Sequence, residues 1–177
     1  INLGNQCLKN TPSRITLFPS KNVPFFRGML KRRLIRTLNK GGNGIILVFC
    51  YRRAEVDSLV RDLTSRGFKV LGCKGGEVGA FLEKFYELKD LDCICTTSAL
   101  SHGVNLGIVR GVFFTYPVKN KDLWFQMVGR GGRRGESFEF FGFNSFLGKQ
   151  NSFLCFVRAI AMDLFMFFLV FLKVRKK

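Results

Sequence analysis

The sequence predicts an α/β domain with three layers, built on a mainly parallel sheet. Apolar runs of strand length alternate along the chain with segments whose apolar residues recur at helical spacing, which is typical of parallel sheets with right-handed crossovers. The run at 45–50 is continuously apolar, as expected of a strand that is covered on both faces. With 177 residues, of which 47% are hydrophobic, the chain has room for one domain with a sizeable core. This composition excludes a disordered tail, a collagen or a coiled coil.

Residues 1–24 contain three prolines and predict an irregular lead-in with at most one short strand, at 14–18. Leucines at every fourth position then predict a helix over 25–40, whose many basic residues either face solvent or form a phosphate-contacting face. A glycine-rich breaker at 41–44 follows. Beyond it we expect strands at 45–50, 68–73, 92–97, 109–116 and 137–143, and helices at 53–66, 77–88 and 122–128.

The formal net charge of +17 predicts affinity for a polyanion, either nucleic acid or an acidic membrane surface. The charge is unevenly distributed. Residues 1–43 contain nine Lys and Arg and no Asp or Glu, residues 44–143 contain fourteen basic and eleven acidic residues, and residues 144–177 contain six basic residues and one acidic residue. We therefore expect three parts. They are a basic lead-in with a helix at 1–43, a conventional domain at 44–143, and a Phe-rich hydrophobic tail with a basic end at 144–177.

The tail contains a largely apolar stretch, 153–172, in which only Arg158 and Asp163 are charged. A buried or partner-covered helix is the favoured interpretation. A membrane-associated helix is less favoured because two charges inside the run are costly in lipid, and a non-native extension is the third alternative. Because the chain starts with Ile1, we expect a fragment of a longer protein or a processed product.

Six cysteines raise the question of disulfides or a metal site. Four of them, Cys50, Cys73, Cys93 and Cys95, lie in or beside apolar strand-like runs, where a free thiol behaves as a small buried hydrophobe. The sequence has no Cys-x-x-Cys pair and only one histidine, His102. We therefore expect reduced structural thiols, no metal site, and a cytoplasmic or other reducing intracellular location.

In a parallel sheet, ligands bind in the loops beyond the carboxyl ends of the strands, which directs attention to 51–53, 97–105 and 126–135. The segment 126–135 places three arginines among four glycines, so that guanidinium groups can approach a phosphate without crowding. It is either an anion-binding device or a flexible Arg-Gly loop that binds RNA loosely.

The segment 97–105 leaves a strand through a hydroxyl-rich turn. Its Thr and Ser hydroxyls either hold phosphate oxygens or cap a helix. His102 lies in this turn, but no Ser/His/Asp or Cys/His set accompanies it, so we assign it no acid–base role.

Together these segments resemble motifs IV, V and VI of superfamily 2 helicases, in that order. The matching residues are Tyr51-Arg52-Arg53 after a strand, Thr97…Gly103-Val104-Asn105, and Gln126-x-x-Gly129-Arg130-x-Gly132-Arg133. The resemblance covers about 44–143 and matches the second, C-terminal RecA-like lobe. It implies a RecA-like fold, a nucleic-acid partner, an N-terminal lobe in cis or in trans, and ATP with Mg²⁺ held mainly by that first lobe.

The resemblance also implies roles for individual residues. Arg133 and Arg130 would be arginine fingers, and Gln126 would couple nucleotide state to lobe closure. Gly129, Gly103 and Asn105 would lie near the nucleotide. The expected nucleic-acid contacts are Arg52, Arg53, Thr97, Ser98, Ser101 and His102.

Three positions depart from the family pattern. Asn105 stands where many members have Asp, which weakens the expected ribose contact, and Lys74-Gly75 replaces the usual His-Gly after the second strand. Gln126 stands where the DEAD-box branch usually has His, which points away from that branch and toward DNA helicases or DExH-type enzymes. We therefore expect DNA rather than RNA as the partner.

The sequence has no Gly-x-x-x-x-Gly-Lys-Ser/Thr loop and no Asp-Glu-x-Asp/His element. We therefore expect an ATP-dependent helicase lobe that is inactive without a first lobe. The alternatives are a non-catalytic scaffold that binds nucleic acid and, less favoured, a membrane-tethered protein that uses 153–172.

Overall fold

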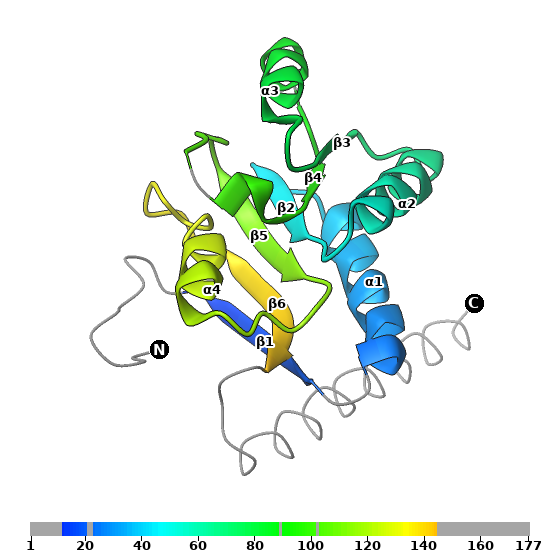
Figure 1. Cartoon of the computed structure of the whole chain (residues 1–177), viewed down its shortest axis with the longest axis vertical. Coiled ribbons are helices and arrows are strands. Elements are labelled where there is room, and N and C mark those ends of the chain that lie inside the picture. Colours follow the sequence, from blue (N-terminus) through cyan, green and yellow to red (C-terminus); the bar gives the residue numbers. More distant parts are fainter. Residues whose placement is uncertain (1–11, 21–22, 89, 102, 145–177) are drawn as a thin grey trace, which may run out of the picture.

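The computed structural model describes residues 12–20, 23–88, 90–101 and 103–144. They form a six-stranded sheet in the order β1-β6-β5-β2-β4-β3, and every neighbouring pair of strands is parallel (Figure 1). The strands are β1 (Arg14–Pro19), β2 (Ile45–Phe49), β3 (Val70–Cys73), β4 (Cys93–Thr96), β5 (Val109–Phe114) and β6 (Glu139–Asn144). The helices are α1 (Val23–Asn39), α2 (Arg53–Ser65), α3 (Val78–Glu87), the short 3₁₀ helix η1 (Ser98–Ser101) and α4 (Lys121–Val128).

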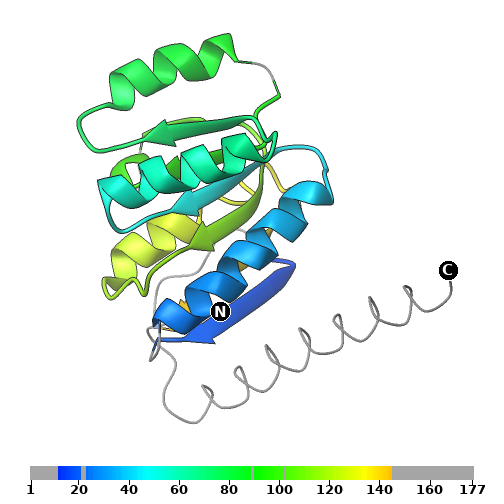
Figure 2. The same cartoon turned by 90° about the vertical axis from the view of Figure 1, so that its right-hand side faces the viewer.

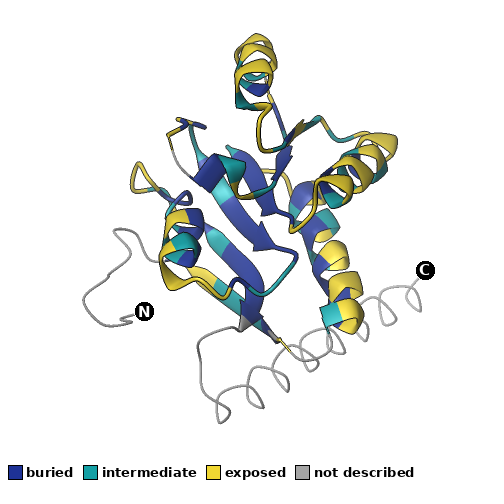
Figure 3. Ribbon diagram, in the orientation of Figure 1, coloured by how far each residue is buried: buried dark blue, intermediate teal, exposed yellow. Residues whose placement is uncertain are grey.

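The alternation of side chains along β2 produces the three layers. Ile45, Leu47 and Phe49 belong to one apolar cluster, which packs against α3, α4 and η1, whereas Ile46 and Val48 belong to the other, which packs against α1 and α2. Both faces of this strand are buried, as its continuous apolar run predicted (Figure 3). Figure 2 shows α1 and α2 side by side in front of the sheet.

The described part of the basic lead-in contributes to this same sheet. Strand β1 pairs with β6 along its whole length, from Arg14 opposite Glu139 onward. Phe18 packs on Phe26 of α1 and on Phe143 of β6, with ring centroids 5.6 and 6.2 Å apart. One strand and one helix from 1–43 therefore belong to the same layered unit as 44–143.

Helix α1 is the helix expected over 25–40, and it covers the sheet. Its buried residues are Phe26, Met29, Leu30, Leu34 and Leu38. Arg110 of β5 connects the carboxyl end of α1 to the start of β2. Its guanidinium donates to the carbonyl oxygen of Gly44, before β2, at 2.9 Å and to that of Thr37, in α1, at 3.1 Å.

The other expected elements are confirmed within a few residues. Strand β3 begins two residues later than expected, because the Lys69 amide donates to the side chain of Asp92 at 2.8 Å instead of to a neighbouring strand. Cys50, Cys73, Cys93 and Cys95 are buried free thiols, as predicted. In the part of the chain that the structure describes, no helix is long and apolar enough to cross a membrane. The tail at 145–177, including 153–172, lies outside the described residues.

Candidate functional site

The three segments singled out by sequence lie at two different ends of the sheet. Tyr51, Thr97 and Ser98 line one groove beyond the carboxyl ends of β2 and β4. The segment 126–135 instead returns to the opposite end, where the Gly132 amide approaches the carbonyl oxygen of Val109, the first residue of β5, at 3.4 Å. The expectation that all three share the carboxyl end is wrong for 126–135. Helix α4 connects two parallel strands, so it returns the chain to the amino end before the loop begins.

The loop that follows α4 owes its shape to glycines. A Cβ atom on Gly131 would collide with the ring of Phe138, and one on Gly132 would lie 2.8 Å from the carbonyl oxygen of Glu136. Gly132 also has a φ of +62°, which favours glycine. The base of the loop is therefore packed tightly against the residue that leads into β6.

Arg130 is inside the protein. It is only 2% exposed, and its guanidinium donates to the carbonyl oxygens of Ser101, at 3.1 Å, and Val104. Burial and, to a lesser extent, the positive charge of Arg133 together lower its pKa to about 10, so the group remains protonated at neutral pH. Its Nη2 atom has no hydrogen-bond partner among the described residues. Arg130 thus holds the connection between β4 and β5 from inside the protein.

Arg133 and Arg134 lie on the surface of the same loop. The Nε atom of Arg133 donates to the carbonyl oxygen of Gly129 at 3.1 Å. Gln126 is exposed on α4, one turn before the loop, while the adjacent Met127 is buried against the sheet. The loop therefore presents two exposed cations and an amide next to a buried third cation, which suits an anionic ligand.

The expected nucleotide-side residues of the β4–β5 connection are exposed. Gly103 has a φ of +73°. The side chain of Asn105 accepts a hydrogen bond from the Gly107 amide at 3.2 Å, so its oxygen is engaged in a local turn. Ser101 is buried, and His102 lies outside the described residues.

A groove of about 550 Å³ lies at the carboxyl end of the sheet. Thr97 and Ser98 line it, and the Thr97 hydroxyl accepts from the Ala99 amide at 3.5 Å, so it also serves as a weak cap of η1. The rings of Tyr51 and Tyr116 lie 5.3 Å apart here, and Tyr51 is 65% exposed. Hydroxyl groups and an exposed aromatic ring therefore share one hollow.

The two arginines after β2 differ in their surroundings. Arg52 is exposed and precedes the first turn of α2. Arg53 donates to the carbonyl oxygen of Gly75 at 3.0 Å and forms an ion pair with Glu77 at 2.9 Å. Since its charge is already paired, Arg53 is a weaker phosphate-binding candidate than Arg52.

Sequence reasoning missed several residues of the groove: Arg27, Tyr116, Lys119 and Asn120. The last three follow β5, so the rule about carboxyl ends of strands could have identified them. Arg27 comes from the first turns of α1, and no local pattern predicts that this part of the helix lies beside the carboxyl end of β2.

Two comparisons with known proteins bear on this geometry. The sequence model of the helicase conserved C-terminal domain family matches residues 29–135, more than half of the chain. The fold is similar to that of a DEAD box protein from Methanococcus jannaschii, with a TM-score of 0.60 at 19% identity over 85% of this chain. It is also similar to E. coli DEAD-box protein SrmB bound to the regulator of ribonuclease activity A, with a TM-score of 0.61 at 18% identity over 76% of this chain.

A third similar structure is the L327V variant of S. cerevisiae Dbp5 bound to RNA and ADP BeF3, with a TM-score of 0.58 at 18% identity over 85% of this chain. The present chain spans 39% of the M. jannaschii protein, 78% of the SrmB chain and 40% of the Dbp5 chain. At these identities the likeness establishes the fold. None of the three structures supports the expectation that DNA is favoured over RNA.

Proposed function

The chain belongs to the helicase conserved C-terminal domain family, and from this premise we propose that it completes the ATPase site of a two-lobe, superfamily 2 nucleic-acid helicase. The observation that carries the proposal is the loop at 129–135 after α4, called the Gly–Arg loop below, which lies within the matched residues. This loop combines a rigid glycine base with exposed cations, the arrangement that stabilises charge on a transferring phosphoryl group.

The loop suits the phosphates of ATP. Its exposed arginines, Arg133 and Arg134, are positive, so they match phosphate oxygens and repel a metal ion. We therefore assign Mg²⁺ to the first lobe. When bound, the nucleotide would supply the phosphoanhydride bond that is hydrolysed.

Arg133 and Arg130 have different roles in this proposal. Arg133, on the surface, is the arginine finger that contacts the developing negative charge. Arg130 is a positioning residue, because its buried guanidinium fixes the segment from Ser101 to Val104 against the loop. Gln126, exposed one turn earlier on α4, couples the nucleotide state to closure of the two lobes.

The groove at the carboxyl end of the sheet is the proposed path of a single nucleic-acid strand. Tyr51 offers an exposed face on which a base can stack, and Lys119 offers positive charge for the backbone. Such contacts are independent of sequence and weaken with salt. The four buried free thiols support a reducing compartment as the place of action.

The test is ATP turnover by the complete two-lobe enzyme with Arg133→Ala, compared with Arg134→Ala on the same exposed loop. Loss of an arginine finger lowers turnover by about 10³-fold or more, while nucleic-acid affinity stays unchanged. The neighbouring substitution leaves turnover within a few-fold. Unchanged turnover with Arg133→Ala would refute the finger assignment. If the unmutated two-lobe protein bound nucleic acid but turned over no ATP, that result would favour a scaffold.

A further inference from the structure

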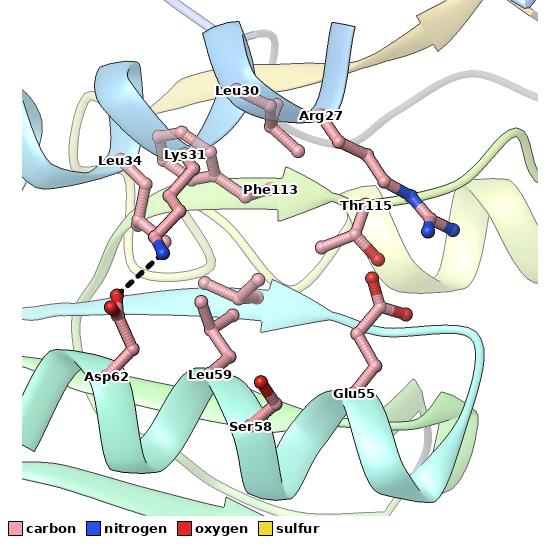
Figure 4. A pocket seen from close by; sticks show the side chains of 11 residues that line it. Arg27, Leu30, Lys31, Leu34, Glu55, Ser58, Leu59, Asp62, Phe113 and Thr115 are labelled. Atoms are coloured by element: carbon pink, nitrogen blue, oxygen red, sulfur yellow. Dashed lines mark ion pairs between the residues drawn. The ribbon is translucent and has the colours of Figure 1, made fainter. Parts of the chain in front are cut away.

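A second hollow lies between α1 and α2, on the face of the sheet opposite α4 and η1. It has a volume of about 240 Å³. Its floor is formed by Val48 and Phe113, and its walls by Leu30, Leu34 and Leu59 (Figure 4). The interior is therefore apolar and large enough for one bulky side chain.

The two ends of this pocket differ in charge pairing. At one end Lys31 of α1 forms an ion pair with Asp62 of α2 at 3.1 Å. At the other end Arg27 and Glu55 face each other in Figure 4. Glu55 accepts from the Tyr51 amide at 3.1 Å, and Arg27 makes no ion pair among the described residues. The pocket thus has one closed end and one end with a cation available.

The charged side chains of helix α1, which forms one wall of the pocket, are all positive. Between residues 23 and 39 it carries five arginines and lysines and no acid. An acidic partner would be attracted to this helix while an apolar side chain fills the pocket. The chain's own tail has the wrong charge for this role, because residues 144–177 carry six basic residues and one acid.

We propose that the pocket between α1 and α2 docks a short acidic segment of a partner protein, with one Phe, Leu or similar side chain inserted over Phe113 and an acidic side chain on Arg27. A nucleic-acid strand fits less well, since a phosphate backbone gains nothing from an apolar floor. The docking face is opposite the Gly–Arg loop, so the inference does not depend on the ATPase proposal.

The experiment selects ligands from a phage-displayed library of random short peptides with the full chain as bait. Ser58→Trp covers the pocket from an exposed position that lines it on α2. Thr64→Trp is the matched control, since Thr64 is exposed on the same helix and does not line the pocket. Circular dichroism verifies that both variants fold.

We expect enriched peptides to carry a large apolar residue beside Asp or Glu, and to bind the wild type and Thr64→Trp equally. Binding should fall about 10- to 100-fold with Ser58→Trp, and equally when the apolar residue of the peptide is changed to Ala. It should also weaken with salt. No enrichment, equal binding to Ser58→Trp, or enriched peptides without acids would overturn the proposal. It would also be overturned if Ser58→Trp weakened the binding of an RNA or DNA oligonucleotide and of no selected peptide.

Discussion

Replacing Arg130 with Ala should destabilise the lobe far more than replacing Arg133. Arg130 is 2% exposed, and its two hydrogen bonds reach the carbonyl oxygens of Ser101 and Val104, which both lie inside the protein. Each buried carbonyl that loses its partner costs about 1–3 kcal/mol. Release of the buried guanidinium charge offsets part of this cost. We therefore expect Arg130→Ala to lower the free energy of unfolding by about 3 kcal/mol.

Thermal and urea unfolding of the full chain, followed by circular dichroism, measure this loss. For a chain of this size, about 3 kcal/mol corresponds to a decrease in Tm of roughly 6–12 °C. Arg133→Ala removes only an exposed side chain, so its unfolding free energy should change by less than about 0.5 kcal/mol. Equal effects of the two substitutions, or an unchanged Tm with Arg130→Ala, would refute the assignment of Arg130 as a buried positioning residue.

Three further predictions follow from individual contacts. Gly131→Ala should destabilise the lobe by about 1–3 kcal/mol in urea unfolding, because its Cβ collides with the Phe138 ring; a neutral effect would mean that the loop base is loose. Burial raises the pKa of the Cys50 thiol far above its ordinary value near 8.5, so iodoacetamide should modify it slowly at pH 8 in the native chain, as mass spectrometry can measure. Since the unfolded thiol ionises first, the stability from this group is complete below about pH 8.5 and declines as the pH rises above it. Tyr51→Ala should weaken single-strand binding by about 1–3 kcal/mol in fluorescence anisotropy, and unchanged affinity would exclude stacking on this ring.

Much of the fold was predictable from local pattern. Strand β2 is recognisable because both its faces are buried, which makes every residue apolar. Helix α1 is recognisable because Leu30, Leu34 and Leu38 repeat at helical spacing and pack on one face of the sheet. The pairing of β1 with β6 was not predictable in this way, because residues Arg14 and Glu139 are far apart in sequence and only the folded sheet brings them together.

The candidate site was predictable in residue type but not in position. The Gly–Arg loop is recognisable in the sequence because Gly131 and Gly132 have no Cβ atom, which leaves room for the Phe138 ring. Arg130 and Arg133 are the same residue type and lie three residues apart, yet Arg130 is buried and Arg133 is exposed. Spacing alone cannot tell the buried arginine from the exposed one, because the direction of each side chain depends on the turn between them.

Under the proposed function, this chain supplies half of an ATPase site. The most direct measurement is the ATP turnover of the chain, of a first lobe that carries the phosphate-binding loop, and of the two combined, each with and without single-stranded RNA or DNA. Turnover is expected only in the combination, with stimulation by nucleic acid. Turnover by the first lobe alone at the rate of the combination, or none in the combination, would contradict it.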